Sequence, residues 1–168
     1  MNDENIKYLS EKYNDLFIKH YYKEQLMPFW FECGDGWFNL IDRLCNSITH
    51  EINHAKEQLD LKKQRGEAVT DDDYEAIKVT VVQIKEKYGG LRFYTYGSND
   101  YIRGMIDFAE SMSYKTCEVC GNPGTLNKEG WWRTMCQPCR ADDARKKAEW
   151  DTNYKQAAKK LDEQKNDV

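Results

Sequence analysis

Four cysteines in the C-terminal third of the chain stand in two pairs, Cys117 with Cys120 and Cys136 with Cys139. Two residues separate the cysteines of each pair and 15 separate the pairs, a spacing typical of a four-thiolate zinc site. A tight turn within each pair directs both sulfur atoms toward one centre, so that four thiolates lie about 2.3 Å from one tetrahedral ion. Four protein ligands leave no position open for water or substrate. The pattern therefore predicts one structural Zn²⁺.

The same four thiolates could hold iron for electron transfer. No flavin-binding or other redox motif accompanies them, so zinc is the favoured metal. Two further cysteines, Cys33 and Cys45, remain. The acidic N-terminus carries no export signal, so we expect a reducing cytoplasm. There Cys45 is a small apolar helix residue, whereas the role of Cys33 stays open.

A second pattern belongs to a different class of protein. His50, Glu51 and His54 spell H-E-x-x-H within a predicted helix, where both histidines could bind one zinc ion while Glu51 acts as general base of a metallopeptidase. At about 100° per residue, the histidines lie opposite the apolar stripe of that helix and are expected to face solvent. No histidine follows residue 54, which leaves acidic side chains such as Glu75 as the third ligand. The metallopeptidase is therefore the minor alternative.

Basic and aromatic side chains share the outward face of a predicted hairpin and could bind single-stranded nucleic acid. They are Lys85, Lys87, Arg92, Tyr94 and Tyr96, with Lys115, Lys128 and Arg133 extending the basic set. A solvated sheet face with lysines that reach into water is the simpler interpretation.

The tryptophans of the cysteine region are candidate contacts with a protein partner. Trp131 and Trp132 precede Arg133, and Trp and Arg dominate the energetics of protein interfaces. The alternative is that both rings pack the cysteine region against the C-terminal helix.

Apolar periodicity predicts helices over residues 5–25, 37–64 and 101–114, and a further helix over 140–164. Strands over 77–87 and 91–96 form a hairpin around paired glycines. Asp35 is expected to cap the helix that follows it. The fold class is α+β: a helical N-terminal half packed on a short antiparallel β-hairpin, then a four-cysteine zinc ribbon and a C-terminal helix. The expected division is 1–115, 116–140 and 141–168.

Charge is unevenly distributed along the 168 residues, whose net charge is −4. Residues 1–76 carry 9 Lys and Arg against 16 Asp and Glu, and residues 77–168 carry 16 against 13. The acidic half favours a basic or neutral partner surface. No stretch approaches the roughly 20 apolar residues that span a bilayer, so no membrane partner is expected.

Three blocks carry a resemblance to a known family. Residues 32–38 (ECGDGWF), residues 82–94 (VQIKEKYGGLRFY) and the cysteine ribbon occur in this order over residues 28–140. In this the chain resembles a family of small uncharacterised proteins of bacteria and their phages. The resemblance implies little about activity. If the carrier is a phage, it implies a modulator of a host process in the host cytoplasm.

The function predicted from these patterns is a non-enzymatic, zinc-containing interaction protein that binds another protein. A nucleic-acid-binding zinc-ribbon protein and the H-E-x-x-H zinc metallopeptidase are the alternatives.

Overall fold

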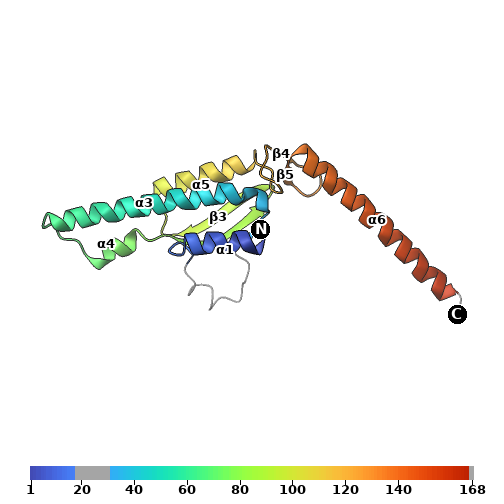
Figure 1. The fold of residues 1–168 in the computed structure, drawn as a ribbon, viewed down its shortest axis with the longest axis horizontal. Coiled ribbons are helices and arrows are strands. Elements are labelled where there is room, and N and C mark those ends of the chain that lie inside the picture. Colours follow the sequence, from blue (N-terminus) through green and yellow to red (C-terminus); the bar gives the residue numbers. More distant parts are fainter. Residues whose placement is uncertain (18–30, 167–168) are drawn as a thin grey trace. The chain divides into compact units, whose positions relative to one another are not determined.

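The computed structural model describes residues 1–17 and 31–166, and side chains within those ranges up to residue 158. The chain divides into two compact units, Met1–Met135 and Cys136–Val168. The predicted α+β class is confirmed: helices cover a small mixed sheet, a separate hairpin bears the four-cysteine cluster, and a long helix ends the chain (Figure 1). The expected three-part division of the chain stays a prediction.

A three-stranded sheet forms the centre of the first unit. Its strands are β1 (Phe31–Glu32), β2 (Thr80–Lys87) and β3 (Gly90–Tyr96), in the order β1-β2-β3. β2 and β3 form the predicted hairpin, with Ile84 opposite Phe93. The short parallel strand β1, which pairs with β2, was not predicted. Two residues are too few to give a periodic signal in the sequence.

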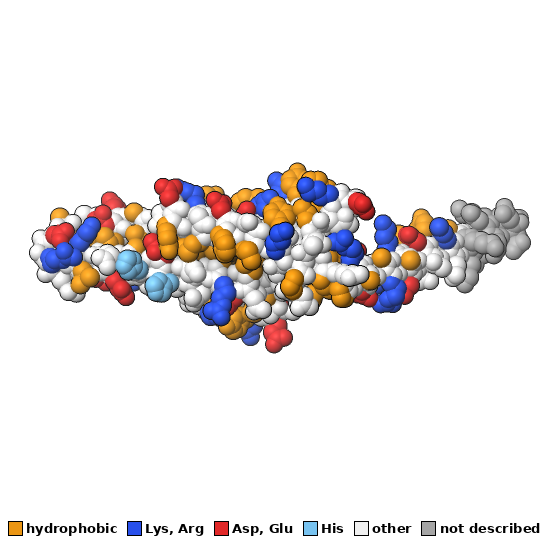
Figure 2. Space-filling view, turned by 90° about the horizontal axis from the view of Figure 1, so that it is seen from above, with side chains coloured by type: hydrophobic (Ala, Val, Ile, Leu, Met, Phe, Trp, Pro, Cys, Tyr) orange, Lys and Arg blue, Asp and Glu red, His pale blue; other side chains and the backbone are white. Residues whose placement is uncertain are grey.

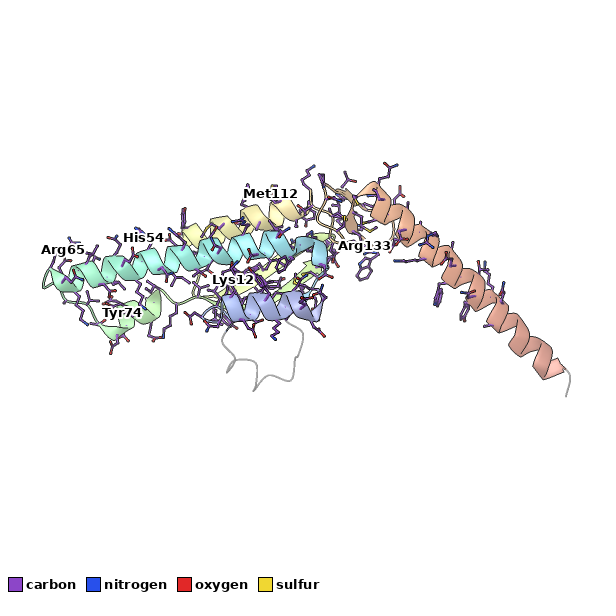
Figure 3. The ribbon with its side chains drawn as sticks, viewed as in Figure 1. Lys12, His54, Arg65, Tyr74, Met112 and Arg133 are labelled. Carbon is purple, nitrogen blue, oxygen red and sulfur yellow. The ribbon has the colours of Figure 1, made fainter. Side chains whose placement is uncertain are left out.

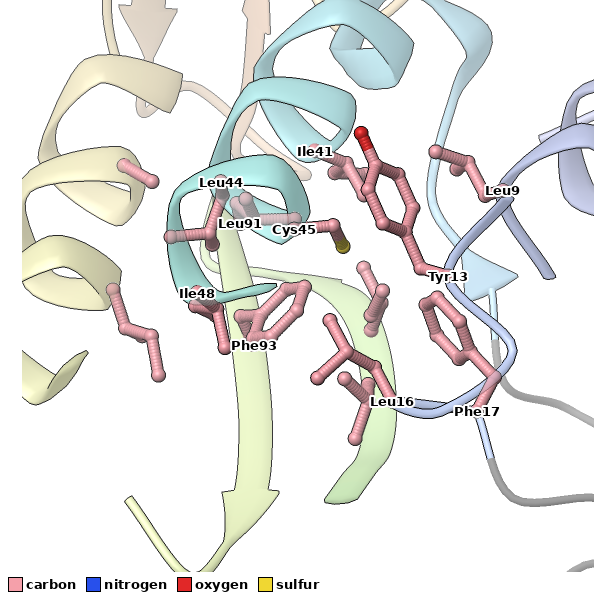
Figure 4. Packing of buried hydrophobic residues seen from close by; sticks show 14 of the residues in the cluster. Leu9, Tyr13, Leu16, Phe17, Ile41, Leu44, Cys45, Ile48, Leu91 and Phe93 are labelled. Atoms are coloured by element: carbon pink, nitrogen blue, oxygen red, sulfur yellow. The ribbon is translucent and has the colours of Figure 1, made fainter. Parts of the chain in front are cut away.

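Helix α3 (Phe38–Gln64) lies over one face of this sheet, with α5 (Asp100–Ser113) on one side and α1 (Asp3–Lys12) on the other (Figure 4). The apolar stripe of α3 is buried. It comprises Ile41, Leu44, Cys45 and Ile48. From the sheet, Ile84, Leu91 and Phe93 meet this stripe in a single core. Because side chains alternate along a strand, the neighbouring residues of β2 and β3 point to the opposite face.

The helix predicted over 5–25 is shorter than expected, because α1 ends at Lys12. Residues 18–25 lie outside the described residues. After Lys12 the backbone leaves the helix at Tyr13, and the carbonyl oxygen of Leu16 accepts a hydrogen bond from the Val81 N–H at 2.9 Å. Leu16 and Phe17 are nevertheless buried, in agreement with the apolar periodicity of this segment. Tertiary contacts with β2 thus override helix propensity here.

Two shorter features complete the first unit. Asn99 caps α5 by accepting a hydrogen bond from the Ile102 N–H at 2.8 Å. Within the expected acidic linker, a short helix, α4 (Asp71–Ala76), begins with a capping box between Thr70 and Asp73. The second unit is the helix α6 (Gln137–Asn166), along which Trp150 and Tyr154 stack with ring centroids 5.4 Å apart.

Candidate metal centre and neighbouring groove

The sulfur atoms of Cys117, Cys120, Cys136 and Cys139 lie within 4.8 Å of one another. A zinc ion with four Zn–S bonds of about 2.3 Å would hold its sulfur atoms about 3.8 Å apart. The cluster therefore needs only small side-chain adjustments to close around one ion. Four cysteine ligands suit Zn²⁺, which binds thiolates tetrahedrally in structural sites. The donor set and its spread fit one structural metal ion.

The first cysteine pair is shaped by a glycine turn. The Gly121 N–H donates to the Cys117 carbonyl at 2.9 Å, and the Cys117 N–H donates to the Asn122 carbonyl at 2.8 Å. Gly121 has a φ of 78°, a conformation that glycine adopts without steric cost. These bonds fold the chain back on itself, which is how two sulfur atoms three positions apart come to face one point.

The second pair follows a small hairpin of β4 (Thr125–Asn127) and β5 (Arg133–Met135). The Glu118 N–H donates to the Thr134 carbonyl at 2.9 Å, which ties the first cysteine turn to β5. Cys139 lies in the first turn of α6, where the helix dipole favours a thiolate.

The block ECGDGWF forms a seat for the first cysteine pair. The Gly36 N–H donates to the Glu118 carbonyl at 2.8 Å, and the Trp37 Nε1–H donates to the Thr116 carbonyl at 2.9 Å. The Gly34 N–H reaches the Glu118 carboxylate at 3.0 Å. A Cβ atom at Gly34 would lie 2.2 Å from the Glu118 carbonyl oxygen, so only glycine allows this approach.

The Asp35 side chain does not cap the helix that follows, contrary to the prediction. Its carboxylate instead accepts hydrogen bonds from the Asn2 N–H at 2.8 Å and the Asn5 Nδ2 at 3.0 Å. The Asn2 backbone bond is the main reason why the pKa of Asp35 is below its usual value. Asp35 therefore ties the start of α1 to the seat.

Gly89 of the second block forms a seat for the β4–β5 hairpin, whereas Gly90 packs against Tyr114, which ends α5. A Cβ atom at Gly89 would lie 2.2 Å from Leu126 Cδ1, and one at Gly90 would lie 2.4 Å from the Tyr114 ring. The buried Thr134 hydroxyl donates to the Gly89 carbonyl at 2.6 Å. Both glycine blocks of the sequence thus contact the cysteine region.

Burial sets the chemistry of three side chains near the centre. It raises the pKa of Glu118, whose residue is only 9% exposed. It also raises the pKa of Cys33 to about 12 and raises that of Cys45. Both thiols belong to the hydrophobic core and are protonated at neutral pH. This answers the open question about Cys33.

A groove of about 740 Å³ opens between the β4–β5 loop and the end of β2. We call it the hairpin groove; its lining residues are Lys85, Glu86, Lys87, Tyr88, Gly130, Trp131 and Trp132. The Tyr88 and Trp132 rings meet edge to face with centroids 6.0 Å apart. The predicted nucleic-acid residues of β2 and the predicted protein-binding tryptophans, which the sequence treated as separate surfaces, therefore line one groove.

Among the predicted binding residues, Arg92, Tyr94 and Arg133 do not line the groove. Arg92 forms an ion pair with Glu110 at 3.4 Å and donates to the Tyr114 hydroxyl at 3.0 Å, so its charge serves the packing of α5 on β3. The Lys85 ammonium lies 5.4 Å from the Tyr94 ring centroid, on the outward face of the sheet. Arg133 is half-buried at the start of β5 (Figure 3).

The H-E-x-x-H residues lie on the exposed side of α3, as predicted. His50 and His54 are exposed, and histidine side chains are visible on the surface in Figure 2. His54 Nε2 lies 3.5 Å from Gln58 Nε2. Among the described residues, the cysteines form the one group of three or more ligand side chains, so no third ligand joins the histidines there. Glu51 lines a shallow 220 Å³ pocket with His50.

Three groove residues were not among the predicted binding residues, namely Glu86, Tyr88 and Gly130, and of these Tyr88 carries an aromatic ring. Tyr88 lies in the turn between β2 and β3. The signal that could have identified it is the pairing of a bulky ring with Gly89 in a two-residue turn, since such turns favour Asn-Gly or Gly-Gly.

No helix within the described residues combines the length and the apolar character required to cross a bilayer. Searches against protein-family models, curated proteins and solved structures found no match for this chain. What supports the resemblance noted in the sequence is thus the four-cysteine cluster alone.

Proposed function

We propose that this protein is a non-enzymatic binding protein in which one structural zinc ion holds a hairpin in place, and that the hairpin groove is its binding surface. The observation that carries the proposal is the linkage between the two sites. Trp131 and Trp132 belong to the loop between β4 and β5, and β5 leads directly to Cys136. The metal-bound segment and one groove wall are therefore the same piece of chain.

The hairpin is too small to fold without support. β4 and β5 have three residues each, and structural zinc contributes on the order of 10 kcal/mol to the folding of such modules. The opposite groove wall, Lys85–Tyr88, belongs to the sheet and its core. Zinc thus supports one wall of the groove, and the sheet supplies the opposite wall. Four cysteine ligands leave the ion no open position, which supports a role without catalysis.

The thiolates must stay reduced, so the cytoplasm is the proposed compartment. The sequence favoured a protein partner for the tryptophans and a nucleic acid for the lysines, and one partner seated in the groove would meet both. The resemblance to bacterial and phage proteins adds the hypothesis that this partner belongs to a host cell.

The test is whether the groove depends on the metal. Indole N–H signals of Trp131 and Trp132 are assigned by Trp→Phe variants and followed by NMR in the zinc-loaded chain. Chelation, or Cys117→Ser with Cys136→Ser, is expected to move both signals to unfolded positions, while His50→Ala with His54→Ala leaves them unchanged. Groove signals that survive loss of the metal, or that move in the histidine variant, would contradict the proposal.

A further inference from the structure

We infer that the hairpin groove binds single-stranded nucleic acid, with bases stacked on its exposed rings and phosphates beside its lysines. The inference rests on the proposed function, because the loop that carries Trp131 and Trp132 adjoins the metal-bound segment. It goes further by assigning the chemical class of the partner.

The first observation is the exposure of the rings. Trp131 is 79% exposed and Tyr88 is 63% exposed, although each is large enough to bury a substantial apolar area. Rings exposed to this extent add little to the core, and their faces are accessible to a ligand. Exposed aromatic faces are the platforms on which unpaired bases stack, and every base offers a face of this kind.

The second observation is the position of the cations. Lys87 Nζ lies 5.5 Å from the Tyr88 ring centroid, and Lys128 Nζ lies 5.0 Å from the Trp132 centroid. Each ammonium is therefore held next to a stacking face, as a strand with a phosphate on every nucleotide requires. Protein interfaces are enriched in aromatic residues but depleted in lysine. Rings accompanied by lysines thus favour nucleic acid over the protein partner that the sequence suggested.

The third observation concerns the acid in the groove. Of the seven lining residues, Glu86 alone is acidic. Its carboxylate accepts a hydrogen bond from the Gly89 N–H at 2.6 Å, so it is occupied in closing the hairpin turn. Lys85 and Lys87 outnumber this single carboxylate, so the lining keeps a net positive charge that complements an anionic strand.

The fourth observation is backbone strain at Tyr88. Tyr88 has a φ of 54° and Gly89 a φ of 76°, the signs that a two-residue hairpin turn of type I′ requires. Asn or Gly adopts this conformation more readily than a bulky aromatic residue. A strained ring exposed in a groove is explained if the ring serves binding rather than stability.

The groove suits a single strand rather than a duplex. It is a hollow between two hairpins with an apolar lining of rings, which can receive a planar base only if that base is unpaired and unstacked. On the outward face of the sheet, Lys85 and Tyr94 form another pairing of a lysine with an aromatic ring. An adjoining nucleotide can bind there.

The experiment is fluorescence anisotropy on the zinc-loaded chain of 168 residues. The probes are fluorescein-labelled oligo(dT) and oligo(U) of about 15 nucleotides, a matched duplex, and a peptide of equal length rich in Glu and Tyr. We expect both single strands to bind more tightly than the duplex and the peptide. A preference between oligo(dT) and oligo(U) then distinguishes DNA from RNA as the source of the strand.

The variants test each observation separately. Trp131→Ala is expected to weaken oligonucleotide binding about tenfold, whereas Trp150→Ala, an equally large exposed ring on α6, leaves it unchanged. Lys85→Ala with Lys87→Ala is expected to reduce the slope of log K against log salt by about 1.4. The matched control is Lys62→Ala with Lys63→Ala, two exposed lysines at the end of α3.

Tyr88→Asn separates binding from folding. It relieves the strained turn position, so the melting temperature is expected to stay at or above that of the parent chain while oligonucleotide binding weakens. A merely structural role for Tyr88 predicts that both quantities change together or that binding is unaffected.

Several results would overturn the inference. They are no saturable binding of either single strand at about 100 μM protein and low salt, equal losses in the control variants, tighter binding of the duplex, or tighter binding of the acidic peptide with the same dependence on Trp131. Zinc per chain is measured on the same samples. If cysteine-bound zinc is present and no strand binds, this inference fails alone; if that zinc is absent, the proposed function fails first.

Discussion

Gly36 and the carbonyl oxygen of Cys117 are in such close contact that a Cβ atom at Gly36 would lie 2.1 Å from that oxygen. The same added Cβ atom would lie 2.7 Å from the Cys120 backbone nitrogen and 2.5 Å from that of Gly121. The residue between Asp35 and Trp37 is thus pressed against the turn that carries two metal ligands. The first cysteine pair is thus packed against the core of the first unit.

Gly36→Ala is therefore expected to destabilise the protein. The atoms in its way are backbone, which cannot move aside as a flexible side chain does, so a cost on the order of 1–3 kcal/mol or more is expected. Urea unfolding of the zinc-loaded chain measures it. Gly104→Ala is the matched control, since among the described residues a Cβ atom there would meet nothing within 4 Å beyond its chain neighbours and its own helix backbone, and alanine favours the helix α5. Equal stability of the two variants would contradict the close packing of Gly36 against the first cysteine turn.

Thr134→Val tests the second seat. The substitution keeps the shape of the side chain but removes the buried hydroxyl that donates to the Gly89 carbonyl. Leaving that carbonyl unpaired is expected to cost about 1–3 kcal/mol. Thr152→Val on α6 removes an exposed hydroxyl bond to Ala148 and should cost less. A larger loss at Thr152 than at Thr134 would refute this assignment.

Cysteine reactivity should divide the six thiols into two classes. Burial raises the pKa of Cys33 to about 12, and the thiolate is the reactive form, so Cys33 and the buried Cys45 should resist iodoacetamide at neutral pH. Chelation should expose the other four cysteines to alkylation, whereas Cys33 and Cys45 should react only in denaturant. Mass spectrometry of the alkylated chain counts the labels. Labelling of Cys33 before denaturation would contradict its place in the core.

Acid should weaken the tie between Asp35 and α1. The folded-state pKa of Asp35 is below the ordinary value of 3.8, so its contribution to stability is present above pH 3.8 and is lost as pH falls through the lower folded pKa. The stability difference between the parent and Asp35→Asn should therefore shrink from about pH 6 to about pH 2. Loss of zinc in acid affects both chains alike. A difference that stays constant with pH would show that the charge of Asp35 contributes nothing.

Local patterns predicted much of the fold. The cysteine spacing anticipated a cluster because each pair closes through its own turn, as the Gly121–Cys117 bond does. The stripe of α3 and the hairpin around Gly89 likewise depend on neighbouring residues. The helix expected over 5–25 was overextended because its end is decided by Leu16 and the distant Val81, which no local pattern reports.

The arrangement of the site could not be predicted for a similar reason. Gly36 and Cys117 are 81 positions apart, and the sequence marks both without indicating that they touch. Arg92 was assigned to an outward basic face, but its partner Glu110 comes from a separate helix. The meeting of Tyr88 with Trp132 likewise depends on how two hairpins dock.

The central claim is that four cysteines hold one zinc ion that supports the fold. Metal per chain, measured by inductively coupled plasma mass spectrometry, tests it in the parent, in Cys117→Ser with Cys136→Ser, and in His50→Ala with His54→Ala. We predict one zinc in the parent, none in the cysteine variant and one in the histidine variant. Zinc that survives the cysteine substitutions, or that disappears with the histidines, would contradict the account.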